Sequence, residues 1–583
     1  MNGFRIGGLL LTFLSFNLTT SAVAAQSLAT VAEPFITHHL GWRQAQYNVR
    51  KNLALQFNTG DVILRGDLYS PDKPTPSPTL LVRIPLDQNK TGRFFSELMG
   101  YFFARRGYNV FIQGVRGRYG STGRHWPFQH EREDGISTLR WIQKQPWHTG
   151  KIGMWGGSYF GHTQWVISDQ KALGLGALAI QIASSNHHTL FFPGGALAYE
   201  TALRWGTRAY SDVDTPLSHT ALLEAMQSGE PLNADLRSVG QKIPFYREWL
   251  SHPQRDAYWQ AADGKNRALE ANVPVLLMAG WYDPYLPGQL ADYKTLQQSS
   301  PFTAYTSRLI IGPWSHAETM TLPDGFVPQH YRLASIAPVL DWYDHHIMGK
   351  SFHGFAPVQA FVSGINQWRS FKDWPPTNTQ ATPFYLTGNT SPLQGILQRQ
   401  PPKAFRKYRY THDPQNPVPS EGGAILLGTQ SGPKRQTSHY RNDVLRFDGQ
   451  MLKEPLTLLG EPRANLWFSS SAPAGDVVVK LIDVHPDGSA YGISQGIVRT
   501  HFMPEKPQKV TVALWAVGHT FLKGHRLRVE VASSHFPMFN VHPGTAENPL
   551  TARHTRKSLQ TLWTGSQYSS TLELPVNTDV TIK

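Results

Sequence analysis

The chain has 583 residues, of which 40% are hydrophobic and only 16% charged, so it is long enough for two to four domains and too apolar to be disordered. It contains no cysteine, which excludes disulfide bridges, a thiol nucleophile and cysteine-ligated zinc or iron–sulfur centres. The formal net charge is +14, but the lysines and arginines are scattered, so we expect a basic globular protein without a nucleic-acid partner.

Residues 1–25 have the pattern of a secretory signal peptide. Arg5 is followed by a mostly apolar stretch over 6–18, and small residues occupy 22–25. The apolar stretch is shorter than the roughly 20 residues that span a membrane. We therefore predict cleavage near residue 25, export to the periplasm or the medium, and no integral membrane segment in the mature protein.

Over residues 26–185 and 273–352 predicted strands alternate with predicted helices. This alternation is typical of a sheet that helices cover on both faces, and we assign both ranges to an α/β-hydrolase core. The predicted strands are 80–83, 109–113, 152–155, 174–182, 273–278 and 308–311. The predicted helices are 93–106, 131–143 and 335–347.

Two further regions differ from this core in pattern. Residues 186–272 are rich in helical spacing, with candidate helices at 196–208, 218–227 and 245–250, and are predicted to form a helical cap. Residues 353–583 show short alternating strands separated by turns, which predicts an all-β jelly-roll domain. A cap in this place would shape the pocket and exclude water.

Three short stretches that follow predicted strands contain Ser158, Asp283 and His316. A serine, an acid and a histidine in this chain order are typical of α/β-hydrolases. Ser158 would attack the substrate, His316 would carry the proton, and Asp283 would orient the imidazole. The backbone N–H of Tyr159 would then point at the developing oxyanion. The strict five-residue elbow motif is not met, because Phe160 stands where its second glycine is expected.

Several motifs resemble the cocaine esterase-like branch of the Xaa-Pro dipeptidyl-peptidase family of serine hydrolases. The matching residues are 153–161, 163–165, 193–197, 281–283, 312–316, 479–484, 524–528 and 533–537. In this family the elbow glycine comes one residue later, at Gly161. The resemblance implies a hydrolase core, a helical cap and a C-terminal jelly roll, with Ser158, Asp283 and His316 as the triad. It also implies that Arg116 ties loops together rather than touching substrate.

One departure from the family concerns the oxyanion hole. In these enzymes a tyrosine after an Arg-x-Pro turn lends its hydroxyl to the oxyanion, whereas here Leu86 follows Pro85. A backbone N–H of the Leu86 loop, Gln88 or Asn89 would have to replace that donor, or turnover is slow. Removal of one oxyanion donor costs about 3 kcal/mol of transition-state stabilisation in other hydrolases.

The predicted function is hydrolysis of an ester or amide through an acyl-enzyme, with a small molecule or a short peptide as substrate and no cofactor or metal. Tyr285, Trp314, Phe191 and Phe192 are candidate pocket residues, with core packing as the alternative. A dipeptidyl-peptidase, the first alternative, would need a carboxylate for the substrate's amino group. The candidates in the cap are Glu200, Asp212, Asp214, Glu224 and Glu248.

A non-catalytic carbohydrate-binding protein on the same fold is a more distant alternative. A metal hydrolase is disfavoured, because the histidine pairs are adjacent residues whose side chains diverge, and no His-Glu-x-x-His stretch occurs. These pairs are His38–His39, His187–His188 and His345–His346. Both a monomer and a homo-oligomer stay open.

Overall fold

The structure is a computed structural model that describes Thr37 and residues 42–86, 90–210, 217–263, 266–316, 319–352, 354–388, 391–426 and 431–579. The predicted signal peptide lies outside these residues, as do Gln88, Asn89, Asp212 and Asp214. Across the described ranges, no helix combines the length and the apolar character that crossing a membrane requires.

The first of two sheets has ten strands in the order β1-β2-β4-β3-β5-β6-β7-β8-β9-β10. Strands β3 to β9 run parallel to one another, while β1, β2 and β10 pair antiparallel with their neighbours. The bounds are β1 (Val49–Asn58), β2 (Ile63–Pro71), β3 (Ser77–Ile84), β4 (Asn109–Gly114), β5 (His148–Gly157), β6 (Leu175–Gln181), β7 (Val275–Tyr282), β8 (Arg308–Ser315), β9 (Val358–Val362) and β10 (Gln367–Phe371).

Both faces of this sheet are buried, because successive residues of one strand point into different apolar clusters. Leu80 packs with α4 and α17 residues such as Tyr101 and Leu340, whereas Leu81 packs on the opposite face with Leu139 of α5. The predicted doubly covered sheet is therefore confirmed. The flanking helices are α4 (Lys90–Ala104), α5 (Glu131–Ile142), α6 (Tyr159–Trp165), α14 (Leu286–Ser299), α15 (Pro301–Thr306), α16 (Tyr331–Ala334) and α17 (Ile336–His346).

The chain between β6 and β7 forms the helical cap, which has an aromatic core of its own. Trp249 and Trp259 are fully buried there and lie against Phe191. Helices α8, α9 and α11 match the three helices predicted in this region. The bounds are α7 (His187–Phe191), α8 (Tyr199–Tyr210), α9 (His219–Gln227), α10 (Ala234–Val239), α11 (Pro244–Ser251), α12 (Ala257–Asp263) and α13 (Arg267–Glu270).

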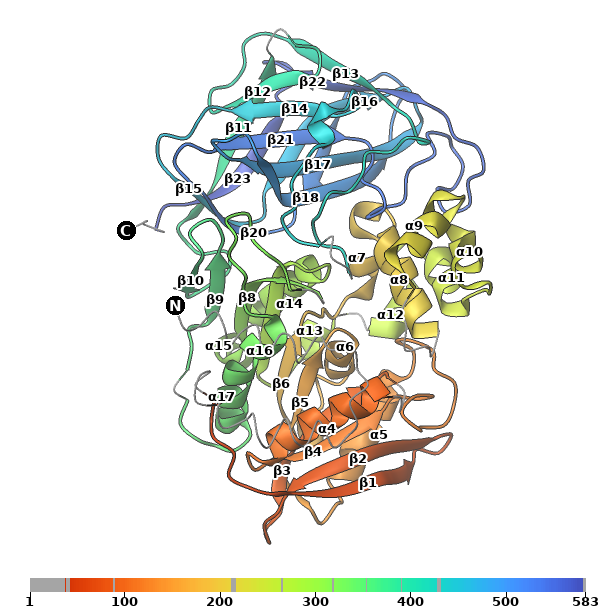
Figure 1. The fold of residues 1–583 in the computed structure, drawn as a ribbon, viewed down its shortest axis with the longest axis vertical. Helices are drawn as coiled ribbons and strands as arrows, with labels where there is room; N and C mark the ends of the chain where they lie inside the picture. The colour runs from red at the N-terminus through yellow and green to blue at the C-terminus, as the bar shows by residue number, and fades with distance from the viewer. Residues whose placement is uncertain are drawn as a thin grey trace.

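The second sheet has thirteen strands and makes up the C-terminal all-β domain, as predicted. In Figure 1 this domain (blue) lies above the hydrolase core (red to green), and the cap helices (yellow) lie beside both. The bounds are β11 (Thr379–Gly388), β12 (Gln394–Gln398), β13 (Arg406–His412), β14 (Leu445–Gly449), β15 (Leu456–Gly460), β16 (Arg463–Ser470), β17 (Ala474–Val484), β18 (Ala490–His501), β19 (Gln508–Ala513), β20 (Val517–Phe521), β21 (Arg526–Ala532), β22 (Ser558–Thr564) and β23 (Thr571–Asn577).

The change from one sheet to the other comes later than the predicted boundary at residue 353. Strands β9 and β10 belong to the hydrolase sheet, because Val358 and Ala360 of β9 pair with Leu309 and Ile311 of β8, and β10 pairs with β9. Their alternating pattern looks like that of the following β domain, so composition alone did not separate them. Sheet membership changes between Phe371 and Thr379.

Candidate active site

Ser158 stands on a sharp turn between β5 and α6. Its backbone has φ 56° and ψ −126°, an unusual conformation for a residue other than glycine, and its N–H donates to the Gln181 carbonyl at 3.0 Å. Gly156 has φ 139°, and a Cβ at that position would lie 2.5 Å from the Phe160 Cβ. A Cβ at Gly161 would collide with the Ala183 side chain. The turn therefore requires glycines on both sides of the serine.

The structure brings Ser158, Asp283 and His316 into one hydrogen-bonded chain. His316 Nδ1 lies 2.7 Å from Asp283 Oδ2, and His316 Nε2 lies 3.0 Å from Ser158 Oγ. Asp283 is fully buried and His316 nearly so. A carboxylate only accepts hydrogen bonds, so the proton of the neutral imidazole sits on Nδ1. Nε2 is then free to accept the Ser158 hydroxyl proton.

Tyr285 is the one candidate pocket residue that the structure places against these three side chains. Its ring stacks on His316 with centroids 5.6 Å apart and planes 26° from parallel, and its backbone N–H donates to Asp283 Oδ1 at 2.8 Å. Burial raises the pKa of Tyr285, as does the Asp283 charge, while interaction with Ser158 lowers it.

The other three candidate pocket residues pack elsewhere. Phe191 stacks on Trp249 at 4.6 Å inside the cap, and Phe192 stacks on His188 at 5.4 Å. The third, Trp314, donates from Nε1 to the carbonyl of Gln329 at 2.9 Å. All three are buried, as Tyr285 is, and none of these contacts involves the triad, so a pocket role for Phe191, Phe192 and Trp314 stays a prediction.

Of the groups expected to receive the oxyanion, the structure describes Tyr159 and Leu86. Tyr159 is the first residue of α6, where a backbone N–H has no acceptor within the helix. Its side chain is fixed, because the hydroxyl donates to Glu131 and the ring stacks on Phe128 at 5.2 Å. Leu86 follows β3 and is half-buried against the apolar cluster on one face of the sheet. Gln88 and Asn89 lie outside the described residues.

The cap carboxylates that a dipeptidyl-peptidase would need are largely engaged. Glu200 is buried and ion-paired with Arg204, and its other oxygen accepts the Leu426 N–H at 3.3 Å. Burial raises the pKa of Glu200, although Arg204 opposes this rise and the nearby His316 also lowers it. Arg204 was not singled out from the sequence, but its i,i+4 spacing from Glu200 on a helix was a usable signal.

Of the remaining cap carboxylates, Glu248 accepts a hydrogen bond from Trp126 Nε1 at 3.1 Å, and Glu224 is exposed on α9. Asp212 and Asp214 lie outside the described residues. Within the part of the cap that the structure describes, Glu200 and Glu248 thus already have partners, and an arginine neutralises Glu200.

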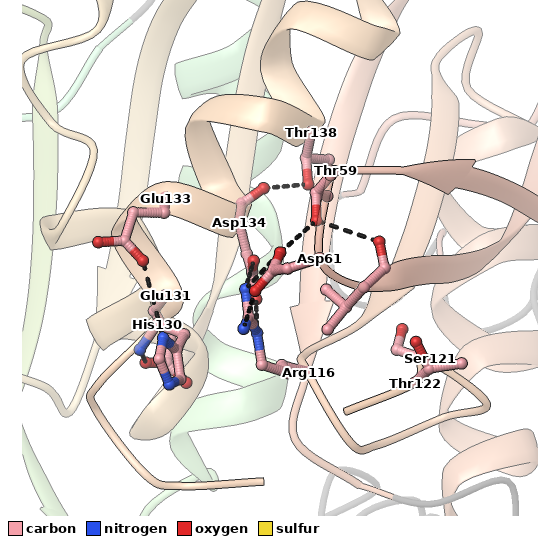
Figure 2. Close-up of polar contacts among 12 residues, drawn as sticks. Thr59, Asp61, Arg116, Ser121, Thr122, His130, Glu131, Glu133, Asp134 and Thr138 are labelled. Atoms are coloured by element: carbon pink, nitrogen blue, oxygen red, sulfur yellow. Dashed lines mark hydrogen bonds and ion pairs between the residues drawn. The ribbon is translucent and has the colours of Figure 1, made fainter. Parts of the chain in front are cut away.

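Arg116 binds two loops together, as predicted. Figure 2 shows its guanidinium between the carboxylates of Asp61 and Asp134, at 2.6 Å and 2.8 Å. Asp134 lies in the first turn of α5 and its side chain is only 2% exposed, whereas Asp61 is largely exposed. The ion pair with Asp134 is therefore shielded from solvent, whereas water and dissolved ions weaken the ion pair with Asp61.

Replacing Arg116 by alanine is expected to destabilise the protein by about 3 kcal/mol, because it leaves the Asp134 carboxylate buried without its partner. The measurement is the urea unfolding transition followed by tryptophan fluorescence. Arg50→Ala is the matched control: its pair with Asp72 is exposed on both sides and should contribute less than about 1 kcal/mol. Equal losses of unfolding free energy in the two variants would contradict the structural role that we assign to the buried Arg116–Asp134 pair.

Both parts of the chain match models of known families. Residues 60–318 match the model of the X-Pro dipeptidyl-peptidase (S15 family), and residues 352–573 match that of the X-Pro dipeptidyl-peptidase C-terminal non-catalytic domain. Cocaine esterase from Rhodococcus sp. (strain MB1 Bresler) is 32% identical over 577 residues, covering 91% of this chain and 99% of that protein.

Two solved structures share the fold over almost the whole chain. An aminopeptidase from the marine sediment archaeon Thaumarchaeota archaeon superposes with a TM-score of 0.79 at 24% identity, covering 92% of this chain and 97% of that one. A CocE/NonD family hydrolase from Staphylococcus aureus superposes with a TM-score of 0.66 at 15% identity, covering 93% of this chain and 98% of that one. Both likenesses extend through the core, the cap and the β domain.

Proposed function

The chain belongs to the X-Pro dipeptidyl-peptidase (S15) family of serine hydrolases, and on this basis we propose that it cleaves an ester or amide through an acyl-enzyme formed on Ser158. The observation that carries the proposal is the unbroken chain from Ser158 Oγ through the His316 imidazole to Asp283, with contacts of 3.0 Å and 2.7 Å. A serine needs such a base and an orienting acid to become nucleophilic.

In the proposed reaction the Ser158 hydroxyl proton moves to His316 Nε2 while Oγ attacks the carbonyl carbon of the substrate. The tetrahedral oxyanion accepts a hydrogen bond from the Tyr159 N–H. His316 then gives its proton to the leaving alcohol or amine, and the acyl group stays on Ser158. A water molecule then gives a proton to His316 Nε2 and attacks the acyl carbon. His316 returns this proton to Ser158 Oγ as the carboxylic acid leaves. Asp283 holds the imidazole and stabilises it while it is charged.

We place the acyl group of the substrate beside Tyr285, the aromatic side chain that contacts His316. The engagement of Glu200 by Arg204 favours an acyl esterase or acylase over a dipeptidyl-peptidase, since a substrate amine would have to compete with a buried guanidinium. The test is a panel of p-nitrophenyl esters, acyl-amino β-lactams and Xaa-Pro anilides. Turnover of esters or acyl-amides is expected. Turnover of only the Xaa-Pro anilides would contradict the preference.

Leu86→Tyr is expected to raise kcat on unactivated amides by about 10²-fold, because the family supplies an oxyanion donor from this position and leucine has none. The variant is compared with Leu86→Phe, which adds the ring without the hydroxyl. A gain in the tyrosine variant alone assigns the effect to hydrogen bonding. If neither variant gains rate, the missing hydroxyl does not limit this enzyme.

We further propose that the protein is exported and that residues 1–25 are removed. This rests on the charged, apolar and small-residue pattern of the N-terminus. N-terminal sequencing of the protein from the periplasm and the medium tests the proposal. Finding the uncleaved chain inside the cell would refute it.

A further inference from the structure

Four polar side chains meet where the β domain touches the hydrolase core. Asp483 lies near the end of β17 and His485 just after it, His519 lies on β20, and His525 directly precedes β21. We call these four residues the Asp–His cluster. They are separated by up to 42 residues in the chain, so no local sequence pattern reveals them.

The nitrogen and oxygen atoms of the cluster are close enough to share one ion. His525 Nδ1 lies 2.8 Å from Asp483 Oδ1, and His485 Nε2 lies 3.9 Å from Asp483 Oδ2. One ligand atom from each of these three residues lies within 4.8 Å of the other two. In a tetrahedral site with the usual zinc bond lengths, neighbouring ligand atoms are about 3.4 Å apart. The observed distances fall on both sides of this value.

The fourth member of the cluster, His519, forms a hydrogen bond with the Asp483 carboxylate. His519 Nε2 lies 3.0 Å from Asp483 Oδ2, and its Nδ1 is buried with no hydrogen-bond partner among the described residues. An ionised carboxylate only accepts, so His519 Nε2 and His525 Nδ1 both carry a proton that points at Asp483. A zinc ion bound through His525 Nδ1 would take the place of the proton there, so its binding would release one. The hydrogen bond from His519 is the arrangement by which a neighbouring group fixes the orientation of a metal ligand.

The donor set selects a class of ion. Two imidazoles and one carboxylate suit zinc and similar divalent transition metals, whereas calcium and magnesium prefer oxygen ligands throughout. The His485 side chain is 23% exposed and the Asp483 side chain 4% exposed. An ion would therefore enter past His485 and end beside a buried negative charge.

The position of the cluster gives such an ion a structural role. It joins the tip of the β17–β18 hairpin to the start of β21, and His519 forms a bridge with Ser363 next to the hydrolase sheet. Gly518, the preceding residue, leaves room for Trp281, since a Cβ there would lie 2.5 Å from the indole. Trp281 is two residues from Asp283.

We propose that Asp483, His485 and His525 bind one zinc ion, with His519 orienting Asp483, and that this ion ties the tip of the β17–β18 hairpin to the start of β21. Zinc binding here is independent of the proposed hydrolysis, because no residue of the Asp–His cluster belongs to the triad of Ser158, His316 and Asp283.

The test is zinc binding by the full-length protein. After incubation with zinc and dialysis, elemental analysis should find one zinc per chain, and cobalt in its place should give the visible absorption of a tetrahedral site. His485→Ala should abolish both signals, and His519→Gln should weaken zinc binding by about 10- to 100-fold. Zinc should raise the melting temperature of the parent protein but not that of His485→Ala.

His554→Ala serves as the matched control, because His554 is an exposed histidine that pairs with Glu547 away from the cluster. It should bind zinc like the parent protein. His485 is the most exposed member of the cluster, so its removal should leave the fold intact, which circular dichroism checks. If the parent protein binds no stoichiometric zinc, or if His485→Ala and His519→Gln both bind it unchanged, the cluster is a hydrogen-bonded network only.

Discussion

Replacing Ser158 by alanine is expected to lower kcat by about 10⁶-fold on the best ester of the substrate panel. The substitution removes the hydroxyl that His316 Nε2 contacts at 3.0 Å, so no acyl-enzyme can form at residue 158. Residual hydrolysis above the uncatalysed rate would come from substrate binding and the Tyr159 N–H. The measurement is steady-state kinetics on purified protein whose melting temperature matches that of the parent.

The control for this prediction is the double variant with His316→Ala. Because Ser158 and His316 act as one unit, His316→Ala alone should lose about as much rate as Ser158→Ala, and the double variant should lose no more. Losses that multiply in the double variant would show that the two side chains act independently, which contradicts the proposed proton transfer.

Asp283→Asn is expected to lower kcat by about 10⁴-fold while leaving the geometry intact. The carboxylate of Asp283 accepts the Nδ1 proton of His316 at 2.7 Å and thereby leaves Nε2 as the acceptor. An amide NH₂ at that place donates instead, which favours the wrong tautomer and removes the charge that stabilises the imidazolium. Steady-state kinetics over a range of pH measures the effect.

Asp292→Asn is the matched control for Asp283→Asn. Asp292 is also a buried aspartate of the hydrolase core, but it accepts hydrogen bonds from Ser185 and does not contact the triad. Burial raises the pKa of Asp292 to about 7, so a neutral amide replaces a group that is already partly uncharged near neutral pH. This variant should keep the parental kcat. An equal loss in both variants would mean that charge near the core, not orientation of His316, controls the rate.

The fold and the positions of Ser158, Asp283 and His316 were predictable because the apolar runs that indicate strands are local patterns and recur along the sequence. Continuous apolar runs identified β5, β7 and β8, and parallel strands place their C-terminal ends at one edge of a sheet. Ser158, Asp283 and His316 follow those runs, so the contact among them is a consequence of the topology. The glycines of the turn were predictable because they stand within three residues of Ser158 in the sequence.

The remaining features depend on tertiary packing that no local pattern records. Phe191 and Trp314 are aromatic, and residue type does not distinguish a pocket wall from the interior of a cap or a sheet. The place of β9 in the hydrolase sheet depends on pairing with β8, where Val358 lies opposite Leu309 from far earlier in the chain. The Asp–His cluster needs three strands of the second sheet to assemble, so its histidines look unremarkable in the chain.

The most direct measurement of the central claim is labelling with a fluorophosphonate, which reacts with an activated serine and mimics the acylation step. We expect one adduct per chain, located by mass spectrometry on the peptide that contains Ser158. Labelling should slow when ester substrate is added and should be absent in Ser158→Ala. A folded parent protein that takes no label, or an adduct on a different serine, would contradict the assignment of Ser158 as the nucleophile.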